Sequence, residues 1–118
     1  TASIVNISSN ASLRGYANNS IYAASKAAVN SITLSAAKEL GKKNIRINAI
    51  SPGTILTPGV ENYFQQEPNA EDYLKSSILL NRIGTPEDIG NAVSFLLSEN
   101  SKYIHGQVIS IDGGSSIY

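Results

Sequence analysis

Three side chains near the N-terminus have the types and the spacing of a proton-transfer site. Tyr22 follows Ser9 by thirteen residues, and Lys26 follows Tyr22 by four. On a helix, the second spacing places two Cβ atoms about 5–6 Å apart on one face. An ammonium favours the phenolate form of a neighbouring phenol, so a tyrosine in this position can exchange a proton with a carbonyl or alcohol oxygen. The hydroxyl of Ser9 can hydrogen-bond that same oxygen and hold it in place.

Three apolar runs indicate the strands that position these side chains. The runs cover residues 3–7, 45–50 and 108–111, and each is short and rich in isoleucine and valine. Such runs are typical of parallel strands buried on both faces. Helical patterns separate them, so the alternation predicts an α/β fold with a parallel sheet.

Two helices are predicted between these strands. The first covers residues 20–41, with N-caps available from residues 18–20, and it ends at a glycine. The second covers residues 86–97, with Thr85 as its N-cap and Pro86 in its first turn. The apolar side chains of the second helix occupy more than one narrow stripe, which favours burial on two sides, by the sheet and by a partner subunit. Small and apolar residues recur at helical spacing along the first helix: Ile21, Ala24, Ala28, Ile32 and Ala36.

Residues 57–80 differ in character from the rest of the chain. They contain Pro58, Gly59 and Pro68, an acidic cluster and three aromatic side chains. We expect an irregular insert that acts as a substrate lid, since long inserts in compact domains are often functional. A surface helical hairpin with ordinary aromatic packing is the alternative.

The composition argues against several classes of function. Nine basic and nine acidic residues give zero net charge. The one basic cluster, Lys42, Lys43 and Arg46, lies beside a predicted helix end, where cations offset the helix dipole, so a nucleic-acid site is not expected. With no cysteine and one histidine, neither a disulfide nor a metal site is expected. The sequence contains no apolar stretch long enough to span a bilayer and no visible signal peptide, so we expect a cytoplasmic protein.

Four motifs, in this order, resemble those of the short-chain dehydrogenase/reductase family. The first is Ser9 together with Tyr22-Ala-Ala-Ser-Lys26. The other three are Arg46-Ile-Asn-Ala-Ile-Ser-Pro-Gly-Thr-Ile-Leu-Thr57, Arg82-Ile-Gly-Thr-Pro-Glu-Asp-Ile-Gly90 and Gly106-Gln-Val-Ile-Ser-Ile-Asp-Gly-Gly114. The resemblance extends over nearly all 118 residues. The family's serine usually lies thirteen positions before its tyrosine, which favours Ser9 over Ser8.

The resemblance implies a fold and a set of catalytic roles. Residues 1–118 would form the catalytic C-terminal half of one domain, part of a doubly wound, Rossmann-like parallel sheet. Tyr22 would be the general acid in carbonyl reduction and the general base in alcohol oxidation. Lys26 would activate Tyr22, and both side chains would contact the cofactor, Lys26 through a hydrogen bond to the nicotinamide ribose. Ser9 would fix the substrate oxygen between itself and Tyr22. The implied reaction is hydride transfer between NAD or NADP and a small carbonyl compound or secondary alcohol.

Four further positions are implied to contact the cofactor. Pro52 and Gly53 would turn the chain under the nicotinamide ring, while the backbone of Ile55 would meet its carboxamide and the hydroxyl of Thr57 the nearby phosphate. The sequence has no G-x-G-x-x-G motif, and in such a fold that turn and the acidic residue that reads the ribose belong to the first half. Because the chain starts at Thr1 and has no methionine, we expect it to be part of a longer protein. Because it lacks the glycine-rich turn that would hold the pyrophosphate, we expect it to be inactive alone.

The resemblance leaves several alternatives open. It does not decide between NAD and NADP, name the substrate, or place the family's fourth catalytic residue, an asparagine; Asn48 lies in the wrong strand for that role. It implies a homo-oligomer, a tetramer or a dimer, with the two predicted helices at one interface. A non-catalytic binding or scaffold role is the alternative to an enzyme, because a fold alone does not determine function.

Overall fold

The three predicted strands form one parallel sheet. A computed structural model of the chain describes residues 2–118, in which β1 (Ala2–Ile7), β2 (Ile45–Pro52) and β3 (Val108–Ile111) lie in the order β1-β2-β3. β2 pairs with both neighbours in parallel, with Ile4 opposite Ile47 and Ile50 opposite Ile109. β2 extends two residues beyond its predicted end, because Ser110 and Ile111 of β3 pair with its last two residues.

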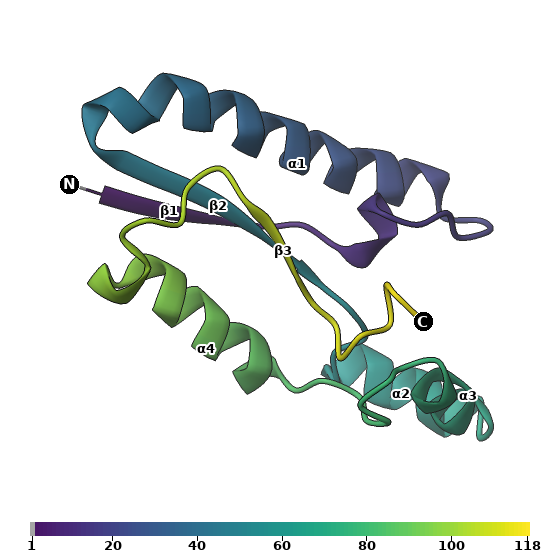
Figure 1. Cartoon of the computed structure of the whole chain (residues 1–118). Coiled ribbons are helices and arrows are strands. Elements are labelled where there is room, and N and C mark those ends of the chain that lie inside the picture. The colour runs from purple at the N-terminus through teal and green to yellow at the C-terminus, as the bar shows by residue number, and fades with distance from the viewer. Residues whose placement is uncertain (1) are drawn as a thin grey trace.

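Two long helices cover the two faces of this sheet. α1 (Ser20–Leu40) lies on one face and α4 (Pro86–Leu97) on the other, which gives three layers (Figure 1). This arrangement confirms the predicted α/β architecture. The central strand contributes more buried apolar residues than any other element: Ile47, Ala49 and Ile50 of β2 are buried, and Leu96 of α4 is 1% exposed. Residues 2–118 also contain three short 3-10 turns: η1 (Asn10–Ser12), η2 (Gly41–Lys43) and η3 (Glu99–Ser101).

The face that α1 turns to the sheet is lined by small and β-branched side chains. Thr33 and Ala37 are its buried residues, and Asn6 of β1 donates from Nδ2 to Thr33 Oγ1 at 3.0 Å. Ile21 and Ile32 of the predicted stripe are 86% and 60% exposed instead. Alanine and serine occur on every side of α1. The spacing of small residues therefore could not distinguish the face that packs on the sheet from the outer face.

The ends of α1 differ from the sequence expectation. Asn19 lies at the N-cap, but its side chain makes no capping hydrogen bond. Gly41 keeps a right-handed helical φ of −57°, and Asn44, after η2, takes the left-handed conformation with φ 58°. The glycine at position 41 makes room for a side chain instead: a Cβ there would lie 3.0 Å from His105 Nε2, which is a tight contact. Nε2 of His105 lies 2.8 Å from Ala37 O, and its Nδ1 accepts from Ile47 N–H, so this imidazole joins α1 to β2.

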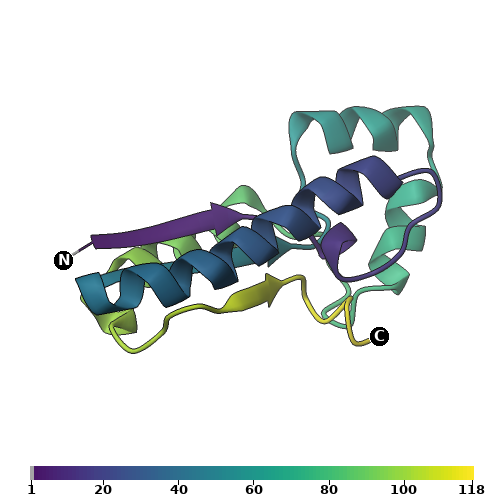
Figure 2. The ribbon, with the colours of Figure 1, turned by 90° about the horizontal axis from the view of Figure 1, so that it is seen from above.

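The segment from 57 to 80 is helical, so the predicted irregular insert is wrong in form. It contains α2 (Pro58–Gln66) and α3 (Ala70–Ser76), which lie beyond the carboxyl ends of the strands (Figures 1 and 2). The observed form, two helices joined by a short turn, is closer to the helical alternative, and the neighbouring Tyr63 and Phe64 rings lie 6.0 Å apart between centroids. Among residues 2–118, no helix is both long enough and apolar enough to cross a membrane.

Candidate active site

Ser9 and Ser8 lie at the carboxyl end of β1 and have different surroundings. Ser8 is 3% exposed, and its Oγ donates to the carbonyl oxygen of Lys26 at 3.1 Å. Ser9 is the N-cap of η1, where its Oγ accepts from Ala11 N–H at 3.1 Å. That bond uses the oxygen as an acceptor only, so the O–H of Ser9 keeps its ability to donate. The side chain of Ser9 lines a cleft, while that of Ser8 is enclosed.

Tyr22 and Lys26 lie one turn apart on α1, as their spacing predicts. Nζ of Lys26 is 5.9 Å from the centroid of the Tyr22 ring. The same Nζ donates to the carbonyl oxygen of Ile7, the last residue of β1, at 3.1 Å. Because an ammonium has three N–H donors, this bond ties α1 to the strand end and leaves donors for a further partner. Tyr22 is 47% exposed and faces the cleft.

The cleft collects side chains from the ends of all three strands. Its volume is about 480 Å³, which falls within the range of small-molecule sites. Ser9, Tyr22, Pro52 and Gly53 line it, so the structure brings together four of the seven predicted site residues; Lys26, Ile55 and Thr57 are not in its lining. Arg14, Tyr16, Tyr73, Leu74 and Ile78 are among the lining residues that the sequence did not single out.

The Pro52–Gly53 turn packs directly on the turn that follows β3. Gly53 N–H donates to Ile111 O at 3.0 Å. A Cβ at Gly53 would lie 2.7 Å from Cβ of Asp112 and 2.9 Å from its Cα. Any side chain would therefore push the two backbones apart, which explains why a glycine follows Pro52 here.

Ile55 belongs to a second, smaller hollow of about 160 Å³. It forms an isolated parallel bridge with Gly84, made by Leu56 N–H to Gly84 O at 2.8 Å and Gly84 N–H to Thr54 O at 3.0 Å. The bridge does not use the N–H or C=O of Ile55 itself. A Cβ at Gly84 would lie 2.6 Å from Ile55 Cδ1 and 3.3 Å from Thr54 O, so a larger residue here would displace the end of the Ile55 side chain and crowd the bridge.

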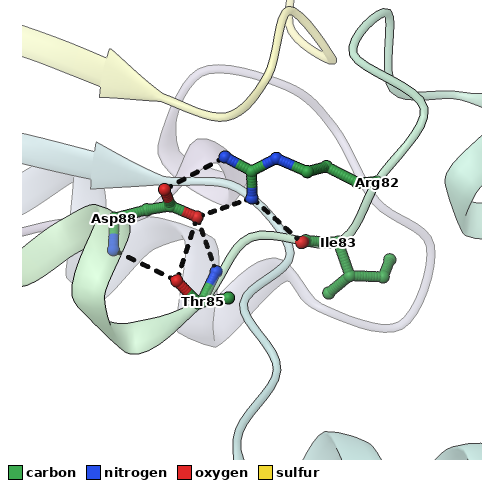
Figure 3. A network of polar contacts seen from close by, with 4 residues as sticks. All are labelled: Arg82, Ile83, Thr85 and Asp88. Atoms are coloured by element: carbon green, nitrogen blue, oxygen red, sulfur yellow. Dashed lines mark hydrogen bonds and ion pairs between the residues drawn. The ribbon is translucent and has the colours of Figure 1, made fainter.

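A charged network fixes the segment that carries Gly84 (Figure 3). Thr85 caps α4, and the Asp88 carboxylate accepts in return from Thr85 N–H at 2.8 Å, which completes a capping box. Arg82 binds both oxygens of Asp88, at 2.7 and 3.0 Å. The Arg82 guanidinium first, and the Thr85 backbone second, hold the pKa of Asp88 well below its usual value. Thr85 and Pro86 thus begin α4 as the sequence predicts.

Thr57 has a similar local role at the start of α2. Its Oγ1 accepts from Val60 N–H at 3.3 Å, and Pro58 occupies the first turn. As with Ser9, the hydroxyl acts only as an acceptor in this bond, so its O–H can donate to a ligand. The N-terminus of α2 adds the positive end of a helix dipole beside it.

The sequence missed the residues that join the Ser9 loop to the end of β3. Asn10, which is 4% exposed, donates from Nδ2 to Asp112 Oδ2 at 2.8 Å. Burial disfavours the charged form of Asp112, yet hydrogen bonds from Ser116, Asn10 and Gly114 outweigh it and hold its pKa below the usual value. The Asp-Gly-Gly sequence after an apolar strand could have indicated a turn held by a carboxylate, but its partner lies 102 residues away.

Two polar residues of β2, Arg46 and Asn48, have structural roles outside the cleft. Arg46 donates to the carbonyl oxygens of Ser98 and Ile104, and Asn48 bonds Ile104 O and Gln107 N–H. These bonds fix the loop that enters β3 and place both side chains away from the cleft. Within residues 2–118, no group of three or more potential metal ligands comes together.

Comparison with known proteins places this fold and cleft in one class. A family model described as enoyl-(acyl carrier protein) reductase matches residues 1–116. The 3-oxoacyl-[acyl-carrier-protein] reductase FabG of Thermotoga maritima is 46% identical over 112 residues, which are 95% of this chain and 44% of that protein. Two solved structures agree: ElxO with NADP bound (TM-score 0.91, 36% identity) and 4-hydroxyisoleucine dehydrogenase complexed with NADH (TM-score 0.92, 38% identity). Each covers 98% of this chain, which spans 47% of theirs.

The chain belongs to the short-chain dehydrogenase/reductase family of oxidoreductases. It spans less than half the length of these relatives. The matched segments and the shared fold confirm the resemblance of the four motifs, and they confirm that the parallel sheet is part of a Rossmann-like fold.

Proposed function

We propose that the protein carrying this chain is an NAD(P)-dependent oxidoreductase that interconverts a small carbonyl compound and its secondary alcohol. The observation that carries the proposal is that Ser9 and Tyr22 line one cleft while the Lys26 ammonium lies beside the Tyr22 ring. When bound, the nicotinamide supplies the hydride chemistry, which side chains cannot perform. The protein supplies proton transfer and orientation.

In the reducing direction, the proton and the substrate oxygen are handled by two hydroxyls. The Ser9 O–H donates to the carbonyl oxygen and orients it. With a hydride supplied to the carbonyl carbon, the Tyr22 O–H bond would break and its proton would go to that oxygen, which would leave a phenolate beside the Lys26 ammonium. Solvent then returns the proton to Tyr22. In the oxidising direction, the phenolate takes the alcohol proton.

The residues predicted to hold the nicotinamide fit that group. The N–H and C=O of Ile55, which the bridge to Gly84 does not use, together match the acceptor and donor of a carboxamide. The Thr57 hydroxyl and the α2 N-terminus suit a phosphate. Lys26 retains N–H donors for ribose hydroxyls beyond its bond to Ile7 O. We assign the cofactor contacts to these groups and to the Pro52–Gly53 turn.

Substrate class and assembly belong to the same proposal. FabG and 4-hydroxyisoleucine dehydrogenase have names that indicate quite different carbon skeletons, so we assign only the shared carbonyl or alcohol. Tyr73, Leu74 and Ile78 extend from the 57–80 segment into the cleft lining, which supports a lid role for that segment as a substrate cover. We further propose a homo-oligomer, most simply a tetramer. Because α1 and α4 cover opposite faces of the sheet (Figure 1), each would contact a different subunit, and the two helices would not share the one interface that the sequence predicted.

A cofactor titration separates the enzyme from a non-catalytic scaffold. The natural protein that carries these 118 residues is titrated with NADH and with NADPH while the nicotinamide fluorescence is recorded. We expect saturable binding of at least one of them, weakened about tenfold by Lys26→Met because charged hydrogen bonds to the ribose are lost. Lys38→Met, which alters a lysine of α1 outside the cleft lining, is the matched control and should bind as the parent does. A protein that binds neither dinucleotide would be the scaffold.

A further inference from the structure

Asp112 connects the loop that carries Ser9 to the turn after β3. Its Oδ2 accepts from Asn10 Nδ2 at 2.8 Å and from Ser116 N–H at 3.0 Å, and its Oδ1 accepts from Gly114 N–H at 2.9 Å. Asn10 directly follows Ser9 and is 4% exposed. A buried amide bonded to a carboxylate has little water to exchange with, so this bond holds the start of η1 in one place.

Two further bonds join the same two segments. Asn10 Nδ2 also donates to Ser115 Oγ at 3.3 Å, and the Arg14 guanidinium donates to Ser115 O. In all three bonds the donor group, Asn10 Nδ2 or the Arg14 guanidinium, comes from the loop between β1 and α1, and the acceptor comes from the turn after β3. The Ser9 loop is therefore held by the C-terminal turn as well as by its own strand.

Asp112 also sets the position of the Pro52–Gly53 turn. Cα and Cβ of Asp112 lie where a side chain at Gly53 would be, at 2.9 and 2.7 Å from an ideal Cβ. Asp112 thus makes two contacts. Its Cα and Cβ pack against the Pro52–Gly53 backbone, which we propose lies under the nicotinamide. Its carboxylate bonds the Ser9 loop, which we propose holds the substrate oxygen.

We propose that Asp112 is a positioning residue that fixes the Ser9 hydroxyl relative to the Pro52–Gly53 turn, and so aligns the substrate oxygen with the nicotinamide. This inference rests on the proposed function and deepens it. Asp112 lines the smaller hollow of Ile55 but not the cleft of Ser9 and Tyr22, so it acts on the substrate oxygen through Asn10 and Ser9 without touching the substrate. Small misplacements of reacting groups lower a reaction rate by large factors. The loss of the hydrogen bond between Asp112 and Asn10 should therefore have a measurable effect on kcat/KM.

A double-mutant cycle with Ser9 tests the proposal in the natural protein. Asp112→Asn keeps the shape of the side chain but loses its charge and one acceptor oxygen. We expect kcat/KM to fall about ten- to hundredfold in the parent, and less than twofold when Ser9 is already alanine, since the hydroxyl to be positioned is then absent. The dissociation constant for NADH or NADPH should change little. Glu87→Gln, which neutralises an exposed carboxylate of α4, is the control and should change neither background.

Equal losses in the two backgrounds would show a general structural effect and overturn the proposal, as would no loss at all. Should Asp112→Asn fail to fold, Asn10→Ala removes the same tie while leaving the Gly114 and Ser116 bonds, and its cycle with Ser9→Ala carries the same expectation. Tyr22→Phe, assayed in parallel, separates a failure of the proposed function from a failure of the positioning role of Asp112. An active Tyr22→Phe variant contradicts the proposed function, whereas an inactive one with an additive Asp112–Ser9 cycle contradicts the positioning role alone.

Discussion

Replacing Tyr22 by phenylalanine is expected to lower kcat by about 10²–10⁴-fold. The change removes one oxygen from a side chain that lies in the cleft with Ser9 and beside Lys26. That oxygen carries the transferred proton in the proposed reaction, and water cannot replace a positioned acid of this kind. The binding of the dinucleotide should remain nearly intact, because Lys26, Ile55 and the Pro52–Gly53 turn are unchanged.

The measurement is steady-state turnover of the natural protein, together with a cofactor titration of the same samples. Tyr103→Phe is the matched control, since Tyr103 is fully exposed at a site remote from the cleft lining, and it should turn over at the parental rate. If Tyr22→Phe kept more than a tenth of the parental kcat, Tyr22 would not be the acid and base.

The isolated 118 residues are expected to show no turnover with any dinucleotide. They contain the three proposed catalytic side chains but no G-x-G-x-x-G turn, so no glycine-rich helix N-terminus holds the pyrophosphate. Among residues 2–118, β1 pairs only with β2, and Ile4 and Ile7 are 39% and 43% exposed along it. A strand edge of this kind is prone to incorrect pairing. Without a held cofactor, the advantage of positioning two reactants together, several kcal/mol of the barrier, is lost.

The corresponding assay measures the turnover of an alcohol with NAD or NADP by two samples. One is the chain alone, and the other is the chain mixed with the N-terminal half of the domain to which it belongs. We expect activity only in the mixture, and none when the chain in the mixture carries Tyr22→Phe. Oxidation of an alcohol by the isolated chain with added NAD or NADP would show that the missing phosphate turn is not needed.

Features with a local signal in the sequence were predicted well. A run rich in isoleucine and valine predicted each of the three strands. Thr85-Pro86 predicted the start of α4, where Thr85 and Asp88 form the capping box. The same signal, Thr57-Pro58, begins α2, but the prolines and glycine of that segment suggested an irregular lid. Its helices form because Pro58 lies in the first turn, where it costs no hydrogen bond, and Pro68 lies between α2 and α3.

Features that depend on distant parts of the chain could not be predicted. The four-residue spacing of Tyr22 and Lys26 predicts that they share one helix face. In the structure the Lys26 ammonium lies beside the Tyr22 ring, as that spacing predicts. In contrast, Asn10 meets Asp112 because β1 and β3 end at the same edge of the sheet, on either side of β2. The roles of Gly53 and Gly84 are similar, since each admits a backbone that is far away in the sequence.

The most direct test of the account follows the hydride itself. The natural protein is supplied with NADH or NADPH carrying deuterium at both positions of the hydride-donating carbon, together with ketones and 3-oxoacyl thioesters, and each alcohol product is analysed by mass spectrometry. The account predicts an alcohol with one deuterium on its carbinol carbon, formed by the parent and at least about a hundredfold more slowly by Tyr22→Phe. Alcohol without deuterium, or no alcohol from any of these carbonyl compounds, would contradict it.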